Sequence, residues 1–269
     1  MTGGTVRAHW LTIGEEGGPT DGRVIEESSL AIYVNGGELV TLMCTPLQQE
    51  ELALGFLRNE NLIQGMDEIE DVHVSEDGCC VEVWLTHQQE APKRRILTSG
   101  CAGGVTFEDL TAELPPVSSA VEIEVADLLT WFESLQPPDG LYAHARGVHA
   151  AGLALEGKIV ARAEDIGRHN AVDKVAGSCL LRGIEARDGA LLATGRISSD
   201  MLRKAARMAC PVVASRTSPT SLSVQMADAL GITLIGYARR GRLRAYAHPE
   251  RLVVDGRPLE AMVSKGSGE

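Results

Sequence analysis

The chain has 269 residues, of which 44% are hydrophobic, and a formal net charge of −12 at pH 7. This length allows one large domain or two smaller ones with a substantial buried core. The negative charge argues against general nucleic-acid binding. No apolar run approaches the roughly 20 residues of a transmembrane helix, and Met1 to Gly4 lack the basic and apolar regions of a signal peptide. We therefore expect a cytoplasmic protein with no nucleic-acid or membrane partner.

The charge is unevenly distributed along the chain. Between Arg196 and Arg257 there are 11 Lys and Arg residues against 4 Asp and Glu residues. A basic segment on an acidic protein predicts a localised anion site, although an ordinary solvated basic face explains it about equally well.

Six cysteines are scattered through the sequence without the paired spacing of a zinc site: Cys44, Cys79, Cys80, Cys101, Cys179 and Cys210. In a cytosolic chain of this size we expect them to be reduced. Cys79 and Cys80 are adjacent in a predicted strand, so they point to opposite faces and are poorly placed to share a metal ion. We interpret both as structural, and we expect no permanently bound metal.

The first part of the chain predicts a small α+β unit. Residues 1–22 are rich in glycine and predict a flexible N-terminus. Residues 23–113 predict a subdomain built on two β-hairpins, which turn at Asn35-Gly36-Gly37 and at Asp77-Gly78. Between the hairpins, Thr45-Pro46 predicts the cap and the start of a helix.

The subdomain ends in the loop Thr98-Ser99-Gly100-Cys101-Ala102-Gly103-Gly104. Its glycines leave the backbone free and allow a bulky partner to approach the sulfur. Cys101 is therefore our candidate catalytic residue, either as a nucleophile or as a carrier that accepts sulfur as a persulfide. The alternative is that it is a small apolar filler in a turn. Residues 93–95, a Lys followed by two Arg, would lower the pKa of this thiol if the loop folds toward them.

Residues 120–269 predict an α/β domain. An amphipathic helix is expected over 125–135, and from Gly147 onward strand-like and helix-like segments alternate. Such alternation implies crossover connections, a mainly parallel sheet and helices on both of its faces. Ligands of these sheets bind at the carboxyl ends of the strands.

Polar groups follow three of these strands, in residues 194–200, 215–218 and 237–242. Backbone N–H groups, hydroxyls and guanidinium groups there suit a phosphate. Tyr237 adds a ring that can stack on a base. The three segments together favour a dinucleotide-like anion. For the first of them, N-capping of a helix by Ser198 or Ser199 is an alternative explanation.

The densest polar stretch runs from Glu164 to Lys174 and includes Asp165, His169 and Asp173. His169 is a candidate general acid or base, because the pKa of histidine is near neutrality. A satisfied hydrogen-bond network at a helix N-terminus explains the same pattern.

These stretches together resemble the FdhD family, the formate dehydrogenase accessory sulfurtransferases or sulfur carrier proteins. The resemblance covers most of the chain from about Ser29. The matching segments are Thr98-Ser99-Gly100-Cys101, Gly147-Val148-His149-Ala150-Ala151, Glu164 to Lys174, Arg196 to Met201, Tyr237 to Arg242 and His248-Pro249-Glu250-Arg251-Leu252.

The resemblance implies a maturation factor for a molybdenum enzyme. A cysteine desulfurase would load sulfur on Cys101 as a persulfide, and the protein would pass it to the molybdenum of a bis(molybdopterin guanine dinucleotide) cofactor destined for formate dehydrogenase. The implied fold is a three-layer core like that of the cytidine deaminases, and the implied assembly is a homodimer. The family's cofactor-binding segment maps onto Tyr237, Ala238, Arg239, Arg240, Gly241 and Arg242.

One departure from the family concerns the mechanism. The usual pattern is Cys-x-x-Cys, whereas this chain has Gly104 at the second cysteine position. Without a resolving thiol, Cys101 would have to discharge its sulfur directly to the acceptor.

Two other functions remain open. A molybdenum-cofactor-binding chaperone without sulfur transfer agrees with the missing thiol. A zinc-dependent deaminase needs His or Cys with Glu two residues later and a Pro-Cys-x-x-Cys segment, but His149 is followed by Ala150-Ala151 and Cys210 stands before Pro211 without a second thiol.

Overall fold

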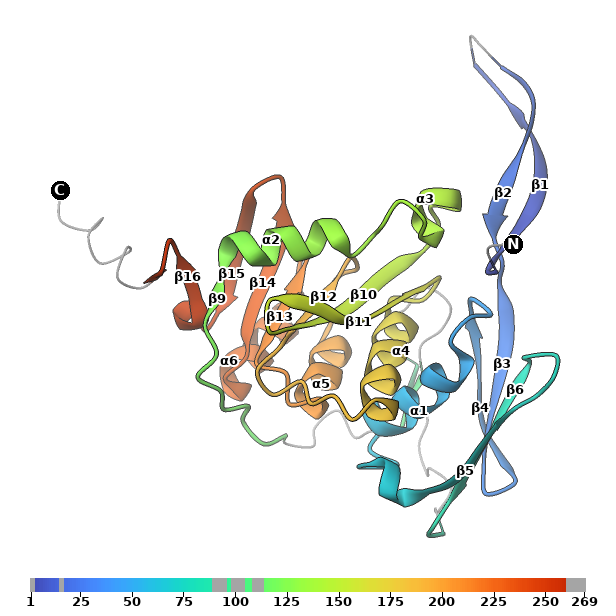
Figure 1. The fold of residues 1–269 in the computed structure, drawn as a ribbon, viewed down its shortest axis with the longest axis horizontal. Coiled ribbons are helices and arrows are strands. Elements are labelled where there is room, and N and C mark those ends of the chain that lie inside the picture. Colours follow the sequence, from blue (N-terminus) through green and yellow to red (C-terminus); the bar gives the residue numbers. More distant parts are fainter. Residues whose placement is uncertain (1–2, 15–16, 89–95, 98–104, 108–113, 260–269) are drawn as a thin grey trace.

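A computed structural model describes residues 3–14, 17–88, 96–97, 105–107 and 114–259. Figure 1 shows a six-stranded sheet with helices on both faces, and a smaller sheet on the far side of helices α4 and α1. The chain is thus a mixed α/β protein with hairpins in its N-terminal part.

The smaller sheet has the strand order β4-β3-β6-β5. Its strands are β3 (Ser28–Val34), β4 (Gly37–Cys44), β5 (Ile69–Val74) and β6 (Cys80–Leu85). Both predicted hairpins are confirmed, and β3 pairs parallel to β6 to join them. The first turn has positive φ at Asn35 (49°) and Gly36 (79°), as expected for the two-residue turns that match the twist of a hairpin.

Helix α1 (Gln49–Asn59) covers this sheet with apolar residues such as Leu52, Leu54 and Phe56, which are 0–2% exposed. Thr45-Pro46 does not cap it. Gln48 precedes the helix in a left-handed conformation and provides no side-chain cap. The reason is that the backbone N–H and hydroxyl of Thr45 are engaged with a buried carboxylate of the larger sheet.

The larger sheet has the order β11-β10-β12-β13-β14-β15. Its strands are β10 (His149–Leu155), β11 (Lys158–Asp165), β12 (Ala190–Ala193), β13 (Val212–Ser215), β14 (Thr233–Arg239) and β15 (Arg242–Ala247). Only β12, β13 and β14 are mutually parallel, and the other pairings are antiparallel. The prediction of a mainly parallel sheet is therefore wrong. Tight turns at 156–157 and 240–241 make β11 antiparallel to β10 and β15 antiparallel to β14. On the other side of the parallel strands, β10 runs antiparallel to β12.

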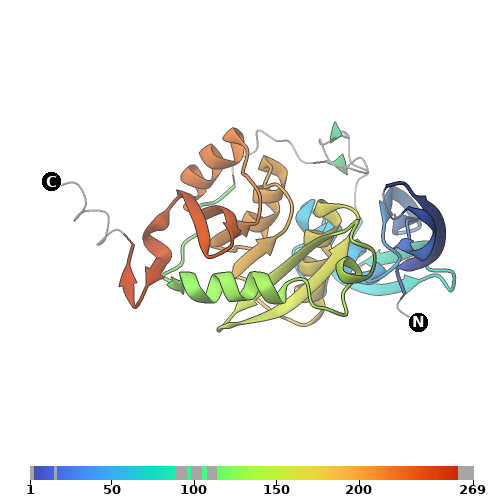
Figure 2. The ribbon, with the colours of Figure 1, turned by 90° about the horizontal axis from the view of Figure 1, so that it is seen from above.

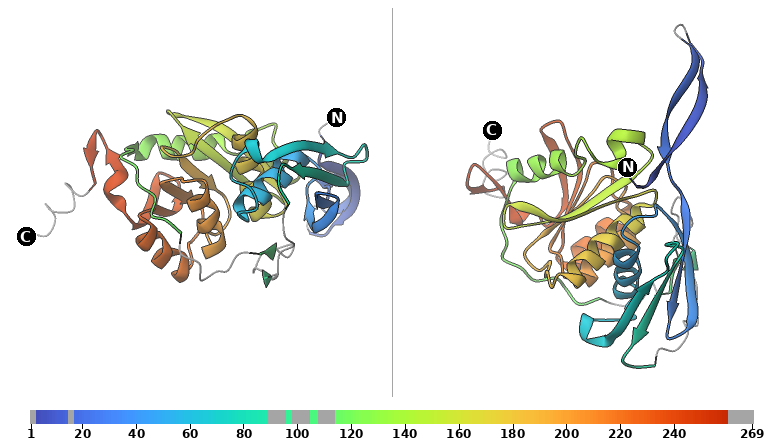
Figure 3. Two further views of the ribbon diagram at one scale, coloured as in Figure 1. Left: turned by 90° about the horizontal axis from the view of Figure 1, so that it is seen from below. Right: turned by 45° about the vertical axis from the view of Figure 1, so that its right-hand side comes forward.

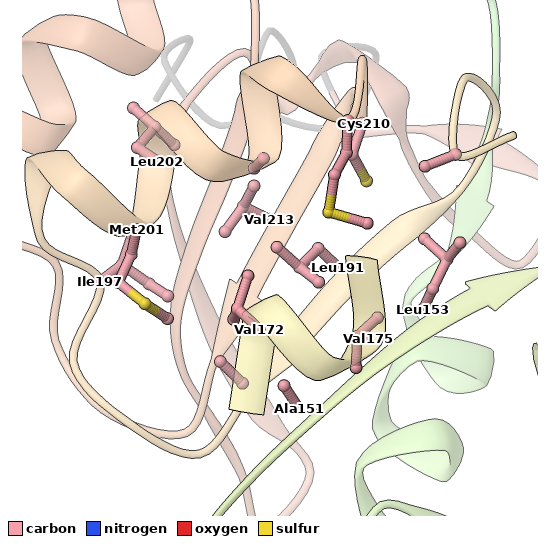
Figure 4. Close-up of a cluster of buried hydrophobic side chains, with 14 of the residues drawn as sticks. Ala151, Leu153, Val172, Val175, Leu191, Ile197, Met201, Leu202, Cys210 and Val213 are labelled. Carbon is pink, nitrogen blue, oxygen red and sulfur yellow. The ribbon is translucent and has the colours of Figure 1, made fainter. Parts of the chain in front are cut away.

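Helices cover both faces of the larger sheet. On one face lie α4 (Arg168–Leu181), α5 (Ser199–Arg207) and α6 (Ser221–Leu230), and on the other lies α2 (Val125–Ser134), as Figure 2 shows from above. Figure 4 shows the core under α4 and α5, where Val172, Leu191 and Val213 are 0–1% exposed. The helix expected over 125–135 is confirmed, and the alternation of strands and helices expected after Gly147 is seen from β10 to β14.

Helix α1 also packs directly on α4. A Cβ added to Gly55 would overlap the carbonyl group of Asp173, and one added to Gly177 would overlap the carbonyl group of Glu51. The two backbones approach this closely because neither glycine carries a side chain. The smaller sheet is thereby attached to the larger one through a helix pair, and the predicted domain limits stay a prediction.

The described part of residues 1–22 belongs to a hairpin, and the predicted flexibility of this segment stays a prediction. Strands β1 (Thr5–Thr12) and β2 (Gly18–Ile25) pair in register as a hairpin that stands away from the other elements in Figure 3. Gly22 lies against the ring of Trp10, where a Cβ would overlap it. The glycine thus makes room for an aromatic residue across the ribbon, which composition alone did not indicate.

The remaining elements are short. They are η1 (Met66–Glu68), β7 (Ile96–Leu97), β8 (Val105–Thr106), β9 (Ile123–Glu124), α3 (Leu141–Ala145), η2 (Pro249–Arg251), β16 (Leu252–Val254) and β17 (Arg257–Pro258). No helix in the described ranges is long and apolar enough to cross a membrane.

Candidate functional site

Polar groups gather where β12 and β13 of the larger sheet end, as the sequence predicts. Ala193 at the end of β12 pairs with Ser215 at the end of β13. Thr194 accepts a hydrogen bond from the Ala150 N–H (2.9 Å), and the Ser215 hydroxyl donates to the Gly195 carbonyl group (2.6 Å). Because α4 and α5 also begin here, their N-termini and the strand ends lie at one edge.

Much of the polarity at the first two strand ends is structural. Ser198 accepts a hydrogen bond from the Met201 N–H (3.4 Å), so it is the N-cap of α5, as the alternative explanation held. Arg216 donates to the Gln136 side chain and to the Phe132 carbonyl group, both at 2.5 Å. These groups position the helices α5 and α2 rather than presenting themselves to a ligand.

The third strand end forms a basic pocket of about 530 Å³, lined by Tyr237, Arg239, Arg240, Arg242, Leu243 and Arg244. The guanidinium group of Arg244 lies 4.5 Å from the centre of the Tyr237 ring and that of Arg239 lies 5.9 Å from it. The predicted segment is not a loop after β14: it is the end of β14, a tight turn with positive φ at Arg240 and Gly241, and the start of β15.

The residues of this basic pocket fit part of a guanine dinucleotide. The volume is in the range of small-molecule sites. Four exposed arginines provide planar donors for a pyrophosphate, and the half-buried Tyr237 provides an aromatic ring, over which Arg244 and Arg239 lie in this structure. The lining contains no carboxylate, so an anion meets no repulsion there.

A second cluster surrounds Asp165, which is 0% exposed. Its Oδ2 lies 2.6 Å from the Lys174 Nζ and accepts hydrogen bonds from the N–H and hydroxyl of Thr45, both at 3.0 Å. Its Oδ1 accepts from the Gly167 N–H (2.7 Å) and the Asn170 side chain (2.9 Å). Both carboxylate oxygens of Asp165 therefore have hydrogen-bond or ion-pair partners. This agrees with the second explanation of the polar stretch, a satisfied hydrogen-bond network at a helix N-terminus. Through Thr45, the network joins the smaller sheet to the start of α4.

A neighbouring network centres on Lys204 of α5. Its Nζ lies 2.7 Å from the Asp173 Oδ2, and the Asn59 amide donates to the Asp173 Oδ1 (2.7 Å). Burial acts to lower the pKa of Lys204. The negative charges of Asp173, Asp200 and Glu60 have the larger combined effect, so the pKa of Lys204 lies above its ordinary value. Burial raises the pKa of Asp173, and Lys204 counteracts that effect.

His169 lies at the start of α4 and is 5% exposed. Its Nδ1 is 2.6 Å from the Asp200 Oδ2, whereas its Nε2 has no hydrogen-bond partner among the described residues. Burial works against the ionised form of Asp200, but Lys204, His169 and Arg203 lower its pKa. The pair thus has one ring nitrogen facing a carboxylate, whereas the other is buried and has no partner among the described residues.

His149, at the start of β10, borders this pair. Burial and the charges of Arg168 and His169 lower its pKa, so it is neutral near pH 7. No group of three or more His, Cys, Asp or Glu side chains is gathered for a metal ion in the part of the chain that the structure describes.

Cys101 and its loop lie outside the described residues, as do Lys93, Arg94 and Arg95. The other five cysteines are free thiols. Burial raises the pKa of Cys44 and Cys179 to about 11 and that of Cys210 to about 12, so these three are poor nucleophiles. Cys79 is exposed and Cys80 half-buried.

Four residues of these sites were missed in the sequence. Arg244 follows Arg242 at the spacing of two that places strand residues on one face, so the strand pattern contained a signal for it. Thr45, Glu60 and Lys204 had none, because each meets its partners from a distant segment.

Comparison with known proteins shows similarity in sequence and in fold. The model of the FdhD/NarQ family matches residues 25–253. The sulfur carrier protein FdhD of Bacillus subtilis is 37% identical over 254 residues, which are 92% of this chain and 97% of that protein. The sulfur carrier protein FdhD of Wolinella succinogenes is 34% identical over 234 residues, which are 85% of this chain and 82% of that protein.

A crystal structure described as a candidate formate dehydrogenase accessory protein from Desulfotalea psychrophila superposes with a TM-score of 0.81 at 30% identity, covering 93% of this chain and all of that one. The match of sequence over most of the chain, together with the match of fold, shows that the chain belongs to the FdhD/NarQ family.

Proposed function

We propose that this protein is a sulfur carrier that accepts sulfur from a cysteine desulfurase as a persulfide on Cys101 and transfers it to the bis(molybdopterin guanine dinucleotide) cofactor of formate dehydrogenase. Its relatives are named sulfur carrier proteins. The observation that carries the proposal beyond their names is the basic pocket of Tyr237 to Arg244, which suits a guanine dinucleotide.

The loading step needs a thiolate and no outside oxidant. The Cys101 thiolate attacks the outer sulfur of the donor's persulfide, a new S–S bond forms on Cys101, and the donor's S–S bond breaks to leave a cysteine thiolate. In the delivery step the S–S bond of the Cys101 persulfide would break to restore the Cys101 thiolate, and the cofactor held by the basic pocket would supply molybdenum as the acceptor of the outer sulfur and as the source of the two electrons that reduce it. Since Gly104 replaces a second cysteine, the sequence provides a one-cysteine carrier.

The pocket has a specific role in delivery. The arginines hold the pyrophosphate and the Tyr237 ring stacks on the guanine, so that the substrate is fixed at the sheet edge. Tyr237, Ala238, Arg239, Arg240, Gly241 and Arg242 are the proposed contact residues, and the geometry adds Arg244.

We expect the double change Arg242→Gln, Arg244→Gln to weaken binding of guanosine diphosphate 10- to 100-fold per lost contact. The reason is that a hydrogen bond to a charged group contributes about 1.5–3 kcal/mol. Isothermal titration calorimetry measures the dissociation constant. Arg257→Gln, an exposed arginine outside the pocket, is the matched control. Unchanged affinity in the double variant would remove the nucleotide from this pocket.

His169 is the proposed acceptor of the thiol proton during loading, because Asp200 holds its Nδ1 while its Nε2 is left without a partner among the described residues. We expect His169→Ala to slow sulfur loading about 100-fold, a usual contribution of general acid–base catalysis, with dimerisation retained. Quenched-flow mass spectrometry gives the rate, and His73→Ala on an exposed histidine is the control. A normal rate would return His169 to a structural role.

The proposal includes the protein's partners and setting: a cysteine desulfurase as donor, formate dehydrogenase as client, a homodimer, and the cytoplasm as the compartment. We also propose a cytidine-deaminase-like core, which is supported by the three layers that the larger sheet forms with the helices on its two faces. The second candidate, a cofactor-binding chaperone without sulfur transfer, is favoured by Gly104 in place of a resolving cysteine, and the two differ in what Cys101 does.

A further inference from the structure

Glu60 is a buried carboxylic acid, 4% exposed, at the end of α1. One of its oxygens, Oε2, accepts hydrogen bonds from the Thr106 hydroxyl (2.9 Å) and from the Phe107 N–H (2.7 Å). The Phe107 ring packs edge-on against Phe56 of the same helix, with ring centres 5.9 Å apart. Helix α1 therefore holds residues 106–107 by one acid and one aromatic pair.

This contact lies at the base of the Cys101 loop. Strands β7 and β8 pair antiparallel, with Ile96 opposite Thr106 and Leu97 opposite Val105. Residues 98–104 connect these two strands in the sequence. Glu60 thus binds the strand by which the loop returns, within five residues of Cys101.

The charged groups that act on Glu60 come from α5, namely Lys204 and Asp200. Behind Lys204 lies Asp173 of α4, which also accepts a hydrogen bond from Asn59. From the described side chains on this side, Thr106 contributes a hydroxyl and Phe107 an aromatic ring, neither of them charged. Burial raises the pKa of Glu60 to about 7, against the opposing effects of Lys204 and of the hydrogen bonds from Phe107 and Thr106.

We propose that Glu60 is a positioning residue for the sulfur-transfer reaction: it clamps the base of the Cys101 loop to the end of α1, and its ionisation loosens that clamp. The clamp itself stands on the contacts of Glu60, whereas its value for catalysis rests on the proposed function of Cys101. An ionised Glu60 favours a hydrated, open base, because a carboxylate loses solvation when buried.

The expected size of the pH effect follows from the difference between the pKa values of Glu60 in the closed and open forms. If the acid titrates near 7 in the closed form and near its ordinary value of about 4.3 in the open form, the opening equilibrium rises about tenfold between pH 6 and pH 8. Glu60→Gln keeps an acceptor for Thr106 and Phe107 but cannot ionise, so its opening should not depend on pH. Lys204 retains Asp173 and Asp200 in that variant, so we expect it to fold.

The first test is hydrogen exchange of the Phe107 amide, corrected for the intrinsic rate of exchange. In the wild type, protection should fall about tenfold from pH 6 to pH 8, and in Glu60→Gln it should stay constant. Thr106→Val removes one hydrogen bond but leaves the acid, so it should lower the protection at both pH 6 and pH 8 and keep its dependence on pH. Protection that varies equally with pH in the wild type and Glu60→Gln would overturn the clamp.

The second test asks whether the clamp positions the thiol. Cys101 is alkylated with iodoacetamide in a background with Cys79→Ser and Cys80→Ser, and the rate is followed against pH. The wild type should show an inflection near pH 7 in addition to the thiol titration, and Glu60→Gln should lack it. Identical profiles would overturn the positioning role. Neither test uses a sulfur donor, so a failure of the clamp is distinct from a failure of Cys101 to accept sulfur.

Discussion

Replacement of Cys101 by serine is expected to abolish activation of formate dehydrogenase, to at least about 1000-fold below the wild-type level. A hydroxyl group cannot hold sulfur as a persulfide and is not ionised near pH 7, whereas a thiolate is the species that attacks. The measurement is formate dehydrogenase activity in cells whose own accessory factor has been deleted and which carry the variant instead.

The other thiols provide the controls for this result. Cys79→Ser and Cys80→Ser should activate the dehydrogenase normally. Cys44, Cys179 and Cys210 cannot substitute for Cys101, because their pKa values of about 11 to 12 leave only about one thiol in 10,000 or fewer ionised at pH 7. Normal activation by Cys101→Ser, with normal nucleotide binding, would decide for the cofactor-binding chaperone.

Replacement of Lys174 by methionine is expected to cause a large loss of stability. Lys174 is 0% exposed and its Nζ lies 2.6 Å from the Asp165 Oδ2. Removing it leaves a buried carboxylate without its counter-charge, which costs about 3–5 kcal/mol. Urea denaturation followed by circular dichroism measures the free energy of unfolding.

Two variants check the cause of that loss. Adding Asp165→Asn to Lys174→Met removes the unpaired charge while keeping a side-chain acceptor, so we expect it to recover most of the stability. Lys158→Met changes an exposed lysine and should alter stability by less than about 0.5 kcal/mol. A double variant no more stable than Lys174→Met alone would show that the buried charge is not the cause.

Local patterns predicted much of the fold. The turns at Asn35-Gly36 and Asp77-Gly78, and the apolar face of the helix that begins at Val125, depend on neighbouring residues, so they could be read from the sequence. The mixed sheet could not, because the direction of β10 relative to the parallel strands depends on its pairing with β12, which follows it in the chain only after β11 and α4. The hairpin of residues 5–25 was missed because its composition is rich in glycine, whereas Gly22 makes room for the Trp10 ring across the ribbon.

Single segments of the candidate site could be predicted from the sequence, but the contacts between distant segments could not. The arginines that follow Tyr237 could be read from the sequence as a basic segment, and the structure places them around one pocket. The role of Thr45 was misjudged because its partners, Asp165 and Lys174, lie about 120 residues away in the sequence. Glu60 had no local signal, since an acid at the end of an amphipathic helix is usually exposed, and only the fold brings Thr106 to it.

The central claim, that Cys101 carries sulfur, is tested most directly by intact-mass spectrometry. The purified protein and its Cys101→Ser variant are incubated with a cysteine desulfurase, its pyridoxal cofactor and cysteine. The account predicts a gain of one sulfur atom on the wild type alone, reversed by a thiol reductant. A wild-type protein that gains no sulfur, or a Cys101→Ser variant that gains it equally, would contradict the account.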